Sequence, residues 1–491
     1  MHRFCISLGF CFAIAFTIPA LAANGSQPTW WAKYQTLLKK GTTTQGSPTL
    51  SVAAGPDVDA SNECGPQSET YIALDTRRPA HLAAGSNEIF RLPMRGYYST
   101  DSGASWGGVD LPLPAAFGAN GTRFGSDPSL AFDTQGNVFY SYIVVFFGNG
   151  AGVNGTEMAV ARSGDGGKTY PAVDYFSFSS GGDHFNDKPM ITADANARSP
   201  YKDSVYVAWD AASGGSSAGG IRFGRSIDHG ASFAVTRIDD PSGPGQGIGA
   251  VPFVGPGGEV YAAWNDYVAH TIAFNRSFDG GVTWGKASVV APQSIGFQIA
   301  VPAESFRGAL IYPSCDADRS IGAHRGRLYC SWVDLGANGR TDVFTTFSDD
   351  RGSTWSKPSP APDTLNADRF NHWLAVDPTN GYVNLSFYDT RNDTTGQRYA
   401  TDVYFTQSAE GTAWLSPNVR VTTTSSNEHD CNGTFPCSGI DYGNQYGDYE
   451  GLASFGGVSH PIWTDSRNQL SPSTGCSTDL AMEEVFTSAV N

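Results

Sequence analysis

Short apolar runs alternate with turns rich in Gly, Asp, Asn and Ser along most of the chain. A clear example is the apolar run at 373–376, a turn at 377–381 and a second run at 382–387. Runs of this kind, bounded by turn residues, are typical of β-hairpins, and helical periodicity is nearly absent. The paired runs recur about every 60 residues, with turns at Asp75, Asp133, Asp194, Gly255, Asp318, Asp377 and Ser454. The pattern therefore predicts an all-β chain of repeated units.

A second pattern follows the strand pairs. Five segments read Ser-x-Asp-x-Gly-x-(Ser/Thr)-aromatic, at residues 99–106, 163–170, 226–233, 277–284 and 348–355. In a tight turn the Asp side chain can accept hydrogen bonds from backbone N–H groups, and the Gly supplies a positive φ. Each motif therefore predicts a hairpin turn between the third and fourth strands of a unit, with its aromatic residue against a neighbouring unit. Five equivalent copies indicate a structural role rather than a catalytic one.

Seven units of four strands predict a seven-bladed β-propeller over residues 48–491, with a six-bladed ring as the alternative. The last unit supplies three strands before residue 491, so its fourth strand is expected from the N-terminal side, around residues 49–53. Such a strand would close the ring and remove open sheet edges.

The first residues have the features of a secretory signal. A basic start at Met1-His2-Arg3, an apolar run and Ala20-Leu21-Ala22 predict a cleavable signal peptide at 1–23, and hence a secreted or periplasmic protein. Residues 24–47 are expected to form an N-terminal segment with a short helix. No later run approaches the roughly 20 apolar residues of a membrane span. The net charge of −16 disfavours nucleic acid and anionic membranes as partners and leaves glycans, for what we expect to be a monomer.

Six of the eight cysteines follow residue 23, and an even number in an exported chain suggests disulfide bonds. In the predicted ring, the loops of Cys64 and Cys476 meet at the closure. Cys315 and Cys330 flank one hairpin, and Cys431 and Cys437 lie in one loop. We therefore predict the pairs Cys64–Cys476, Cys315–Cys330 and Cys431–Cys437.

The five motifs resemble the Asp-box, or bacterial neuraminidase repeat, of the sialidase superfamily, and the resemblance covers roughly residues 48–491. It implies a β-propeller and favours a secreted glycoside hydrolase that cleaves beside an acidic sugar, as exo-sialidases do. Sialidases use three arginines for the substrate carboxylate, a Tyr nucleophile with a Glu, and an Asp acid/base. Phe90-Arg91-Leu92-Pro93 is similar to the family's Arg-Ile-Pro motif, but its place beside the first motif predicts that Arg91 lies away from the channel mouth. A polysaccharide lyase and a non-catalytic glycan- or protein-binding propeller stay as alternatives.

Polar side chains gather in the loops opposite the motif turns, which in a propeller surround the central channel and are the expected place for a ligand pocket. The loops that lead into the first strands carry Glu69, Asp127, His184, Asp187, Lys188, Arg369, Asn371, His372, Tyr446, Asp448 and Glu450. The loops that leave the second strands carry Asp210, Asp266, Asp334, Asp389, Arg391, Asp465 and Arg467.

These loops supply the candidate site residues. The candidate catalytic residues are Asp187 and Glu450 as acid and base, Tyr446, and His184 and His372, either of which can act as the base of a lyase or bind a metal. The candidate substrate-binding residues are Arg369, Arg391 and Arg467, as a clamp for an acidic sugar, and Tyr388, as a stacking surface. In the alternative interpretation, Asp389 pairs with Arg391 and Asp465 with Arg467, which braces the loops. No cofactor is expected to be required, although Ca²⁺ is a possible ligand of the carboxylates at the channel.

Overall fold

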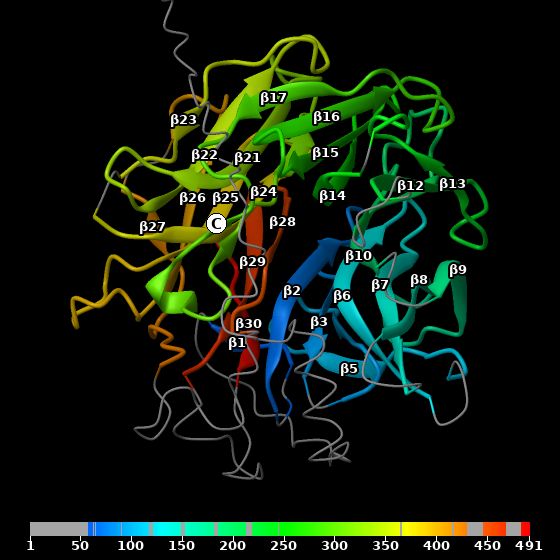
Figure 1. The fold of residues 1–491 in the computed structure, drawn as a ribbon, viewed down its shortest axis with the longest axis horizontal. Coiled ribbons are helices and arrows are strands. Elements are labelled where there is room, and N and C mark those ends of the chain that lie inside the picture. Colours follow the sequence, from blue (N-terminus) through cyan, green and yellow to red (C-terminus); the bar gives the residue numbers. More distant parts are fainter. Residues whose placement is uncertain are drawn as a thin grey trace, which may run out of the picture.

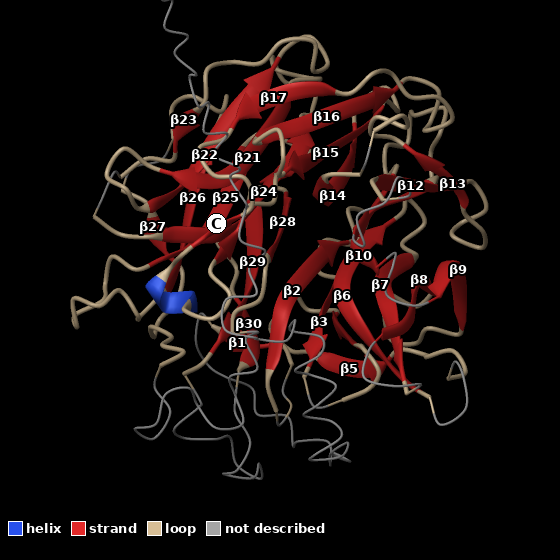
Figure 2. Cartoon of the chain, in the orientation of Figure 1, coloured by secondary structure: helices blue, strands red, loops and turns tan. Residues whose placement is uncertain are grey.

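The computed structural model describes residues 57–61, 63, 65–89, 91–116, 121–148, 153–180, 185–212, 219–243, 245–363, 366–414, 417–429, 445–467 and 483–491. This part of the chain consists of strands and loops with a short 3-10 turn, η2, at Pro302–Glu304 (Figure 2). Seven four-stranded antiparallel sheets form a ring (Figure 1). The predicted seven-bladed propeller is therefore confirmed. None of the described helices is long and apolar enough to cross a membrane. The predicted signal peptide and the segment at 24–47 lie outside the described residues.

In blades 1 to 6, the strands follow one another in sequence from the channel to the rim. Blade 1 comprises β2 (Gln67–Leu74), β3 (Leu82–Glu88), β4 (Arg95–Ser99) and β5 (Gly107–Asp110). Blade 2 comprises β6 (Thr122–Phe132), β7 (Val138–Phe147), β8 (Val153–Ser163) and β9 (Ala172–Ser180). Blade 3 comprises β10 (Phe185–Ala193), β11 (Val205–Ala212), β12 (Ile221–Ser226) and β13 (Ala234–Arg237). Blade 4 comprises β14 (Gly247–Val254), β15 (Val260–Asp266), β16 (Thr271–Ser277) and β17 (Ser288–Pro292).

The remaining blades have the same plan. Blade 5 comprises β20 (Ser314–Ala317), β21 (Leu328–Leu335), β22 (Thr341–Ser348) and β23 (Ser359–Pro360). Blade 6 comprises β24 (Arg369–Val376), β25 (Val383–Asp389), β26 (Asp402–Ser408) and β27 (Val419–Arg420). Between blades 4 and 5, the connection at 293–313 holds η2 and a small hairpin of β18 (Gln298–Ile299) and β19 (Ala309–Leu310).

Blade 7 joins the two ends of the described chain. Its strands are β28 (Gly451–Phe455), β29 (Val458–Asp465), β30 (Glu484–Thr487) and, at the rim, β1 (Val58–Asp59). Val58 lies opposite Thr487, and Asp59 lies opposite Phe486. Closure by an N-terminal strand is thus confirmed, but the strand is at Val58–Asp59 and not around 49–53, which lie outside the described residues. Two residues form a strand too short for a hydrophobic alternation to reveal.

The inner strands β2, β6, β10, β14, β20, β24 and β28 contact one another in this order, and β28 contacts β2 again. The second strands supply large aromatic side chains to the packing between blades, and Trp209, Trp332 and Trp463 are fully buried. Burial of such side chains is the main source of stability in a fold whose sheets touch only their neighbours.

The five motif turns share one set of hydrogen bonds. In blade 4, Ser277 Oγ donates to Asp279 Oδ1 over 2.7 Å, and Asp279 accepts from the Thr283 N–H over 2.8 Å and from Thr283 Oγ1 over 2.6 Å. The hydrogen bonds from Thr283 lower the pKa of Asp279 to about 2. Each motif aromatic packs on the preceding blade, for example Trp284 on Phe223, with ring centroids 4.6 Å apart. The motif therefore closes a hairpin and joins two blades.

We predict that Gly352→Ala destabilises the fold more than Gly396→Ala. Both glycines have positive φ, +79° and +76°, so each substitution should cost about 1 kcal/mol of backbone strain. A Cβ at Gly352 would lie 2.3 Å from Phe274 Cε1 of blade 4, whereas a Cβ at Gly396 has no atom within 4 Å. The overpacking adds about 1–3 kcal/mol at Gly352. Urea unfolding of both variants measures the difference, and equal losses would contradict close packing between blades 4 and 5.

The disulfide Cys315–Cys330 is present and joins the facing strands β20 and β21, as predicted. Cys64, Cys476, Cys431 and Cys437 lie outside the described residues, so the other two pairs stay predictions.

Candidate active site at the front face

The two faces of the ring carry different loops. The motif face holds the five motif turns and also the turns between the first and second strands of the blades. For example, Gly280 in the motif turn of blade 4 lies against Tyr201, which belongs to the turn between β10 and β11 of blade 3. We call the opposite face, where the inner strands begin, the front face. The polar loops in which the sequence predicted a ligand pocket lie at the front face around the channel.

A β-bulge interrupts five of the inner strands near the front face. Each bulge includes a residue with positive φ: Glu69 (52°), Asp127 (61°), Lys188 (51°), Gly249 (66°) and Asn371 (41°). A bulge re-aims one side chain without ending the strand. Non-glycine residues with positive φ store strain, and such residues cluster at functional sites.

Four ionisable side chains from different parts of the ring meet in the channel, and burial raises the pKa of one of them, Glu69, to about 8. Lys188 of blade 3 lies 3.4 Å from Glu69 Oε2 of blade 1 and forms a second ion pair with Asp448, which precedes β28. Arg307, from the connection at 293–313, bonds Glu69 Oε1 over 3.0 Å and also pairs with Asp448. Each cation thus contacts both carboxylates. We call this group the central ion cluster.

Aromatic rings flank the central ion cluster. The Lys188 ammonium lies 4.5 Å from the ring centroid of Tyr449 and 5.3 Å from that of Tyr312. Tyr312 fits here because Gly249 has no side chain, since a Cβ there would lie 2.0 Å from the Tyr312 ring. The rings exclude water from the ion pairs, which strengthens the electrostatic interaction.

Two neighbouring carboxyl groups, Asp127 and Asp187, have opposite pKa shifts. Burial raises the pKa of Asp187 well above its ordinary value, and the charges of Asp127 and Asp210 raise it further. Burial acts on Asp127 in the same sense, but Lys188 and a hydrogen bond from Asp187 outweigh it and lower the pKa of Asp127. Asp187 is therefore the proton donor of this pair, and Asp127 is the carboxylate that accepts its hydrogen bond. Asp187 is also partly exposed.

Glu304 of η2 reaches the same region from the connection at 293–313. The Asn371 side-chain N–H donates to Glu304 Oε1 over 3.3 Å, and Glu304 Oε2 has no hydrogen-bond partner among the described residues. The residue is fully buried, and burial raises its pKa well above the ordinary value. The connection is fixed over the channel by further bonds, such as that from the Phe306 N–H to Gln445 Oε1 over 3.1 Å.

The structure brings Tyr446, Tyr388 and Glu450 together between blades 6 and 7. The two tyrosine rings have centroids 4.6 Å apart, and Thr401 Oγ1 donates to the Tyr446 hydroxyl over 2.8 Å. Glu450 Oε1 accepts from the Thr464 N–H over 3.0 Å. Burial raises the pKa of all three groups, so the neutral forms are favoured. Their predicted roles in catalysis and stacking stay predictions.

The candidate arginines are engaged in ion pairs. Arg369 is buried and bonds Asp389 Oδ2 over 3.0 Å and Asp342 Oδ1 over 3.1 Å. Arg391 also bonds Asp389 Oδ2, over 2.5 Å. The bond between Arg391 and Asp389 is the first bracing contact of the alternative interpretation.

Arg467 is braced separately from the other two arginines. It bonds Asp465 Oδ2 over 2.6 Å and Asp57 Oδ2 over 2.9 Å. Arg91 forms ion pairs with Glu63 and Asp110 instead. A clamp of Arg369, Arg391 and Arg467 on an acidic sugar stays a prediction.

His372 packs away from the central ion cluster, because its ring interacts with the backbone of Ser331 in blade 5. Burial lowers the pKa of His372 to about 4. The other candidate base, His184, lies outside the described residues. The role of either residue as a base stays a prediction.

The free energy of unfolding of the His372→Gln variant is expected to depend less on pH than that of the parent chain. The folded state keeps this imidazole neutral, whereas the unfolded chain binds a proton below a pKa of about 6.5. The neutral imidazole therefore contributes its full stabilisation above pH 6.5, the pKa of the unfolded chain. This stabilisation is lost as the pH falls toward 4, and the loss is about 2 kcal/mol at pH 5. Thermal unfolding of both chains at pH 7 and pH 5 measures this. Equal losses in the two chains would show that His372 is not held neutral.

In the part of the chain that the structure describes, no group of three or more His, Cys, Asp or Glu side chains has an arrangement suited to a metal ion. The central ion cluster explains why: Lys188 and Arg307 already occupy the space between Glu69 and Asp448. Binding of Ca²⁺ stays a prediction.

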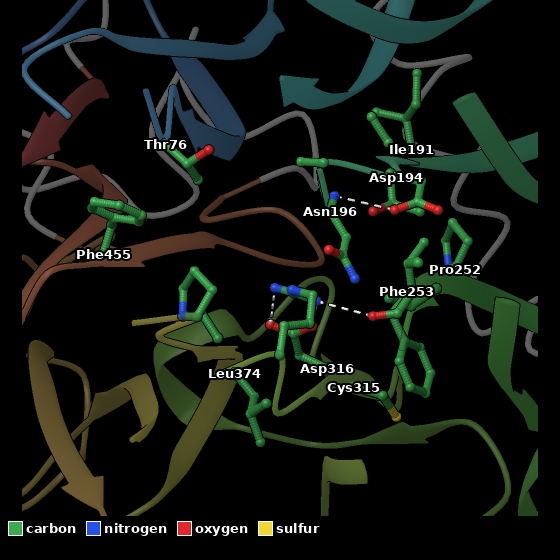
Figure 3. Close-up of a pocket in the computed structure, with 18 of the residues that line it drawn as sticks. Thr76, Ile191, Asp194, Asn196, Pro252, Phe253, Cys315, Asp316, Leu374 and Phe455 are labelled. Carbon is green, nitrogen blue, oxygen red and sulfur yellow. Dashed lines mark hydrogen bonds and ion pairs between the residues drawn. The ribbon is translucent and has the colours of Figure 1, made fainter. Parts of the chain in front are cut away.

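The channel widens again toward the motif face, where it forms a cavity of about 390 Å³ (Figure 3). Ile191, Pro252 and Leu374 line it, with Asp194, Asn196 and Asp316 among its polar groups. Its arginine, Arg319, bonds Asp316 and the Val254 carbonyl oxygen. The guanidinium charge of this cavity is thus balanced by Asp316, and burial raises the pKa of Asp194, which accepts a hydrogen bond from Ser199 Oγ.

Sequence reasoning missed Glu304, Arg307 and Tyr312. All three belong to the connection at 293–313, which has no strand-pair pattern and no motif. The sequence signal that could have revealed these residues was the length of the connection. It spans residues 293–313, whereas the connection between β13 and β14 spans only residues 238–246.

No known protein family matches the chain, and a comparison with curated proteins finds no match. Among solved structures, the leech intramolecular trans-sialidase is 13% identical, with a TM-score of 0.46 over 76% of this chain and 72% of that chain. The intramolecular trans-sialidase of Ruminococcus gnavus is 12% identical, with a TM-score of 0.43 over 90% and 97%. An α-L-arabinanase of Penicillium chrysogenum is 15% identical, with a TM-score of 0.37 over 60% and 92%.

Sialidases stand among these matches, as the motif resemblance predicted. The likeness concerns the propeller fold. At these identities and scores it carries no argument about activity, which must come from the side chains of this chain.

Proposed function

We propose that this chain is an exported, carbohydrate-active glycoside hydrolase that cleaves a bond beside an acidic sugar at the front face. The observation that carries the proposal is the Asp127–Asp187 pair beside Lys188 and Arg307. Two carboxyl groups with separated pKa values provide a proton donor and an ionised partner in one site. Two cations beside them provide a counter-charge for a substrate carboxylate.

In the proposed reaction, the Asp187 carboxyl group gives its proton to the glycosidic oxygen as the bond from this oxygen to the anomeric carbon breaks. Water adds its hydroxyl to the anomeric carbon, and its remaining proton returns to Asp187. Asp127 holds Asp187 in place through their hydrogen bond and is stabilised as an anion by Lys188. The substrate carboxylate replaces one present partner of Arg307, which is the partly exposed cation of the central ion cluster.

The sequence supports this assignment through the motif resemblance and the predicted signal peptide at 1–23. Tyr446 and Glu450 adjoin the site, and the Tyr446 carbonyl oxygen accepts from the Glu69 N–H over 3.3 Å. A sialidase-like use of Tyr446 as nucleophile is the finer form of the proposal.

A screen against sialosides and acidic polysaccharides tests the proposal against its two alternatives. Reducing ends without unsaturated products are expected for a hydrolase. An absorbing unsaturated uronate would instead show a lyase. Binding without any product across the panel would show a non-catalytic propeller, and either result would overturn the proposal.

A further inference from the structure

A second groove, of about 560 Å³, lies on the motif face between blades 4 and 5. It is formed by the turn of blade 4 around 256–259, the turn of blade 5 around 323–327 and the blade 5 motif. Its charged side chains are Glu259, Arg325, Arg327, Asp349 and Arg351, and His324 and Tyr261 also line it. Three guanidinium groups in one groove are notable in a chain with a net charge of −16.

Arg325 is held in a fixed orientation by neutral acceptors. Its Nη1 donates to the Arg319 and Ser320 carbonyl oxygens over 2.7 Å each, and its Nη2 donates to the Pro256 carbonyl oxygen over 3.2 Å. No carboxylate among the described residues bonds this guanidinium group. Its positive charge is therefore oriented in advance and not balanced by a bonded acid, which is the arrangement that an anion site requires.

Arg351 faces the groove from a strained position in the blade 5 motif. Its φ is +58°, where a side chain costs roughly 1 kcal/mol. Its side chain is 62% exposed, and its ion pair with Glu259 is long, at 3.5 Å. Most of its N–H donors have no acceptor among the described residues and stay available to a ligand.

The other basic groups of the groove have partners. Arg327 bonds both Asp349 oxygens, over 2.7 and 2.9 Å, and lies 4.2 Å from the Phe347 ring centroid. His324 lies 3.9 Å from Glu410 Oε2. The unbalanced charge of the groove thus lies on Arg325, which bonds only carbonyl oxygens, and Arg351 adds N–H donors that its long ion pair with Glu259 leaves unused.

We propose that this groove is an accessory, non-catalytic site for an oxyanion, a carboxylate or sulfate group, of an acidic polysaccharide. The planar donor fork of arginine matches both groups. That the anion belongs to a saccharide rests on the proposed function, whereas the anion site itself does not. The acidic chain repels a polyanion at long range, but at 0.1 M salt this field is screened beyond about 10 Å, so the local guanidinium groups decide binding.

Hydrogen–deuterium exchange, measured during titration with sodium sulfate, an oligogalacturonide, a sulfated disaccharide and neutral maltotriose, tests the proposal segment by segment. The anions should protect 318–328 and 348–355, and maltotriose should not. Arg325→Gln/Arg351→Gln should bind at least about 10-fold more weakly, because two charge-assisted contacts are lost. Arg351→Gln alone, which leaves the Arg325 turn intact, should also raise the anion concentration at the midpoint of the titration. Arg198→Gln, an exposed arginine of blade 3 with the same charge change, should bind like the parent chain.

The result separates this site from the front face. Absence of protection with every anion, or equal midpoints in the parent and the double variant, would overturn the anion site. Protection by inorganic sulfate alone would restrict the ligand to a free anion and remove the polysaccharide. Failure of the proposed hydrolase would appear elsewhere, as absent turnover with protection of 318–328 intact.

Discussion

The Lys188→Met variant is expected to lose about 3–5 kcal/mol of unfolding free energy, the largest stability effect that we predict for a single substitution. The substitution removes the cation that contacts Glu69 and Asp448 and lowers the pKa of Asp127, all three of which are buried. Within the central ion cluster, Arg307 must then balance both Glu69 and Asp448, and Asp127 loses the cation that lowers its pKa. The excess negative charge stays buried or is removed by uptake of protons at neutral pH. Methionine keeps most of the side-chain volume, so the loss reports on charge and not on a cavity. Urea unfolding measures it.

The matched control is Lys202→Met. Lys202 is half exposed on the motif face, with Asp203 at 3.8 Å. Exposed pairs of this kind contribute little, so a change below about 0.5 kcal/mol is expected. If the two variants unfold at the same midpoint, the central ion cluster does not hold blades 1, 3 and 7 together.

Asp187→Asn should lower turnover by about 10²–10⁴-fold while the chain stays folded. An amide occupies the same space and can still donate a hydrogen bond to Asp127, but it has no proton to transfer to a leaving oxygen. The proposed reaction requires protonated Asp187, so the rate of the parent chain should fall as the pH rises through the raised pKa of this group. The measurement compares kcat/KM of the variant with that of the parent chain, on the substrate found in the glycan screen.

Asp266→Asn is the control for this experiment. Asp266 ends β15 on the same face, and its side chain accepts from the Val268 and Ala269 N–H groups without contact to the central ion cluster. It should keep the parent rate. An Asp187→Asn variant with parent kcat/KM would exclude Asp187 as the acid.

The strand pairs and the five motifs were sufficient to predict the ring and its number of blades, because both patterns are local and repeated. The closing strand was placed wrongly at 49–53, since the two-residue β1 pairs through its backbone with β30 and leaves no alternation in the sequence. The bond Cys315–Cys330 could be predicted because both residues flank one hairpin.

The sequence predicted which loops carry the candidate site residues, but it did not predict which of these side chains contact one another. The loops with Asp187, Lys188 and Asp448 were identified, yet a bulge decides which side chain turns into the channel. The bulge shifts the register of β10 locally and leaves no periodic pattern in the sequence. Arg307 reaches Glu69 across 238 residues of sequence, along a connection with no periodic pattern. Such long-range contacts depend on the path of the loop, which local patterns do not specify.

The most direct test of the proposed reaction centre is a crystal structure of the Asp187→Asn variant with the acidic oligosaccharide that the parent chain cleaves. The scissile oxygen is expected within hydrogen-bond distance of residue 187, and the substrate carboxylate on Arg307. An oligosaccharide bound elsewhere, with the central ion cluster unchanged, would contradict the account.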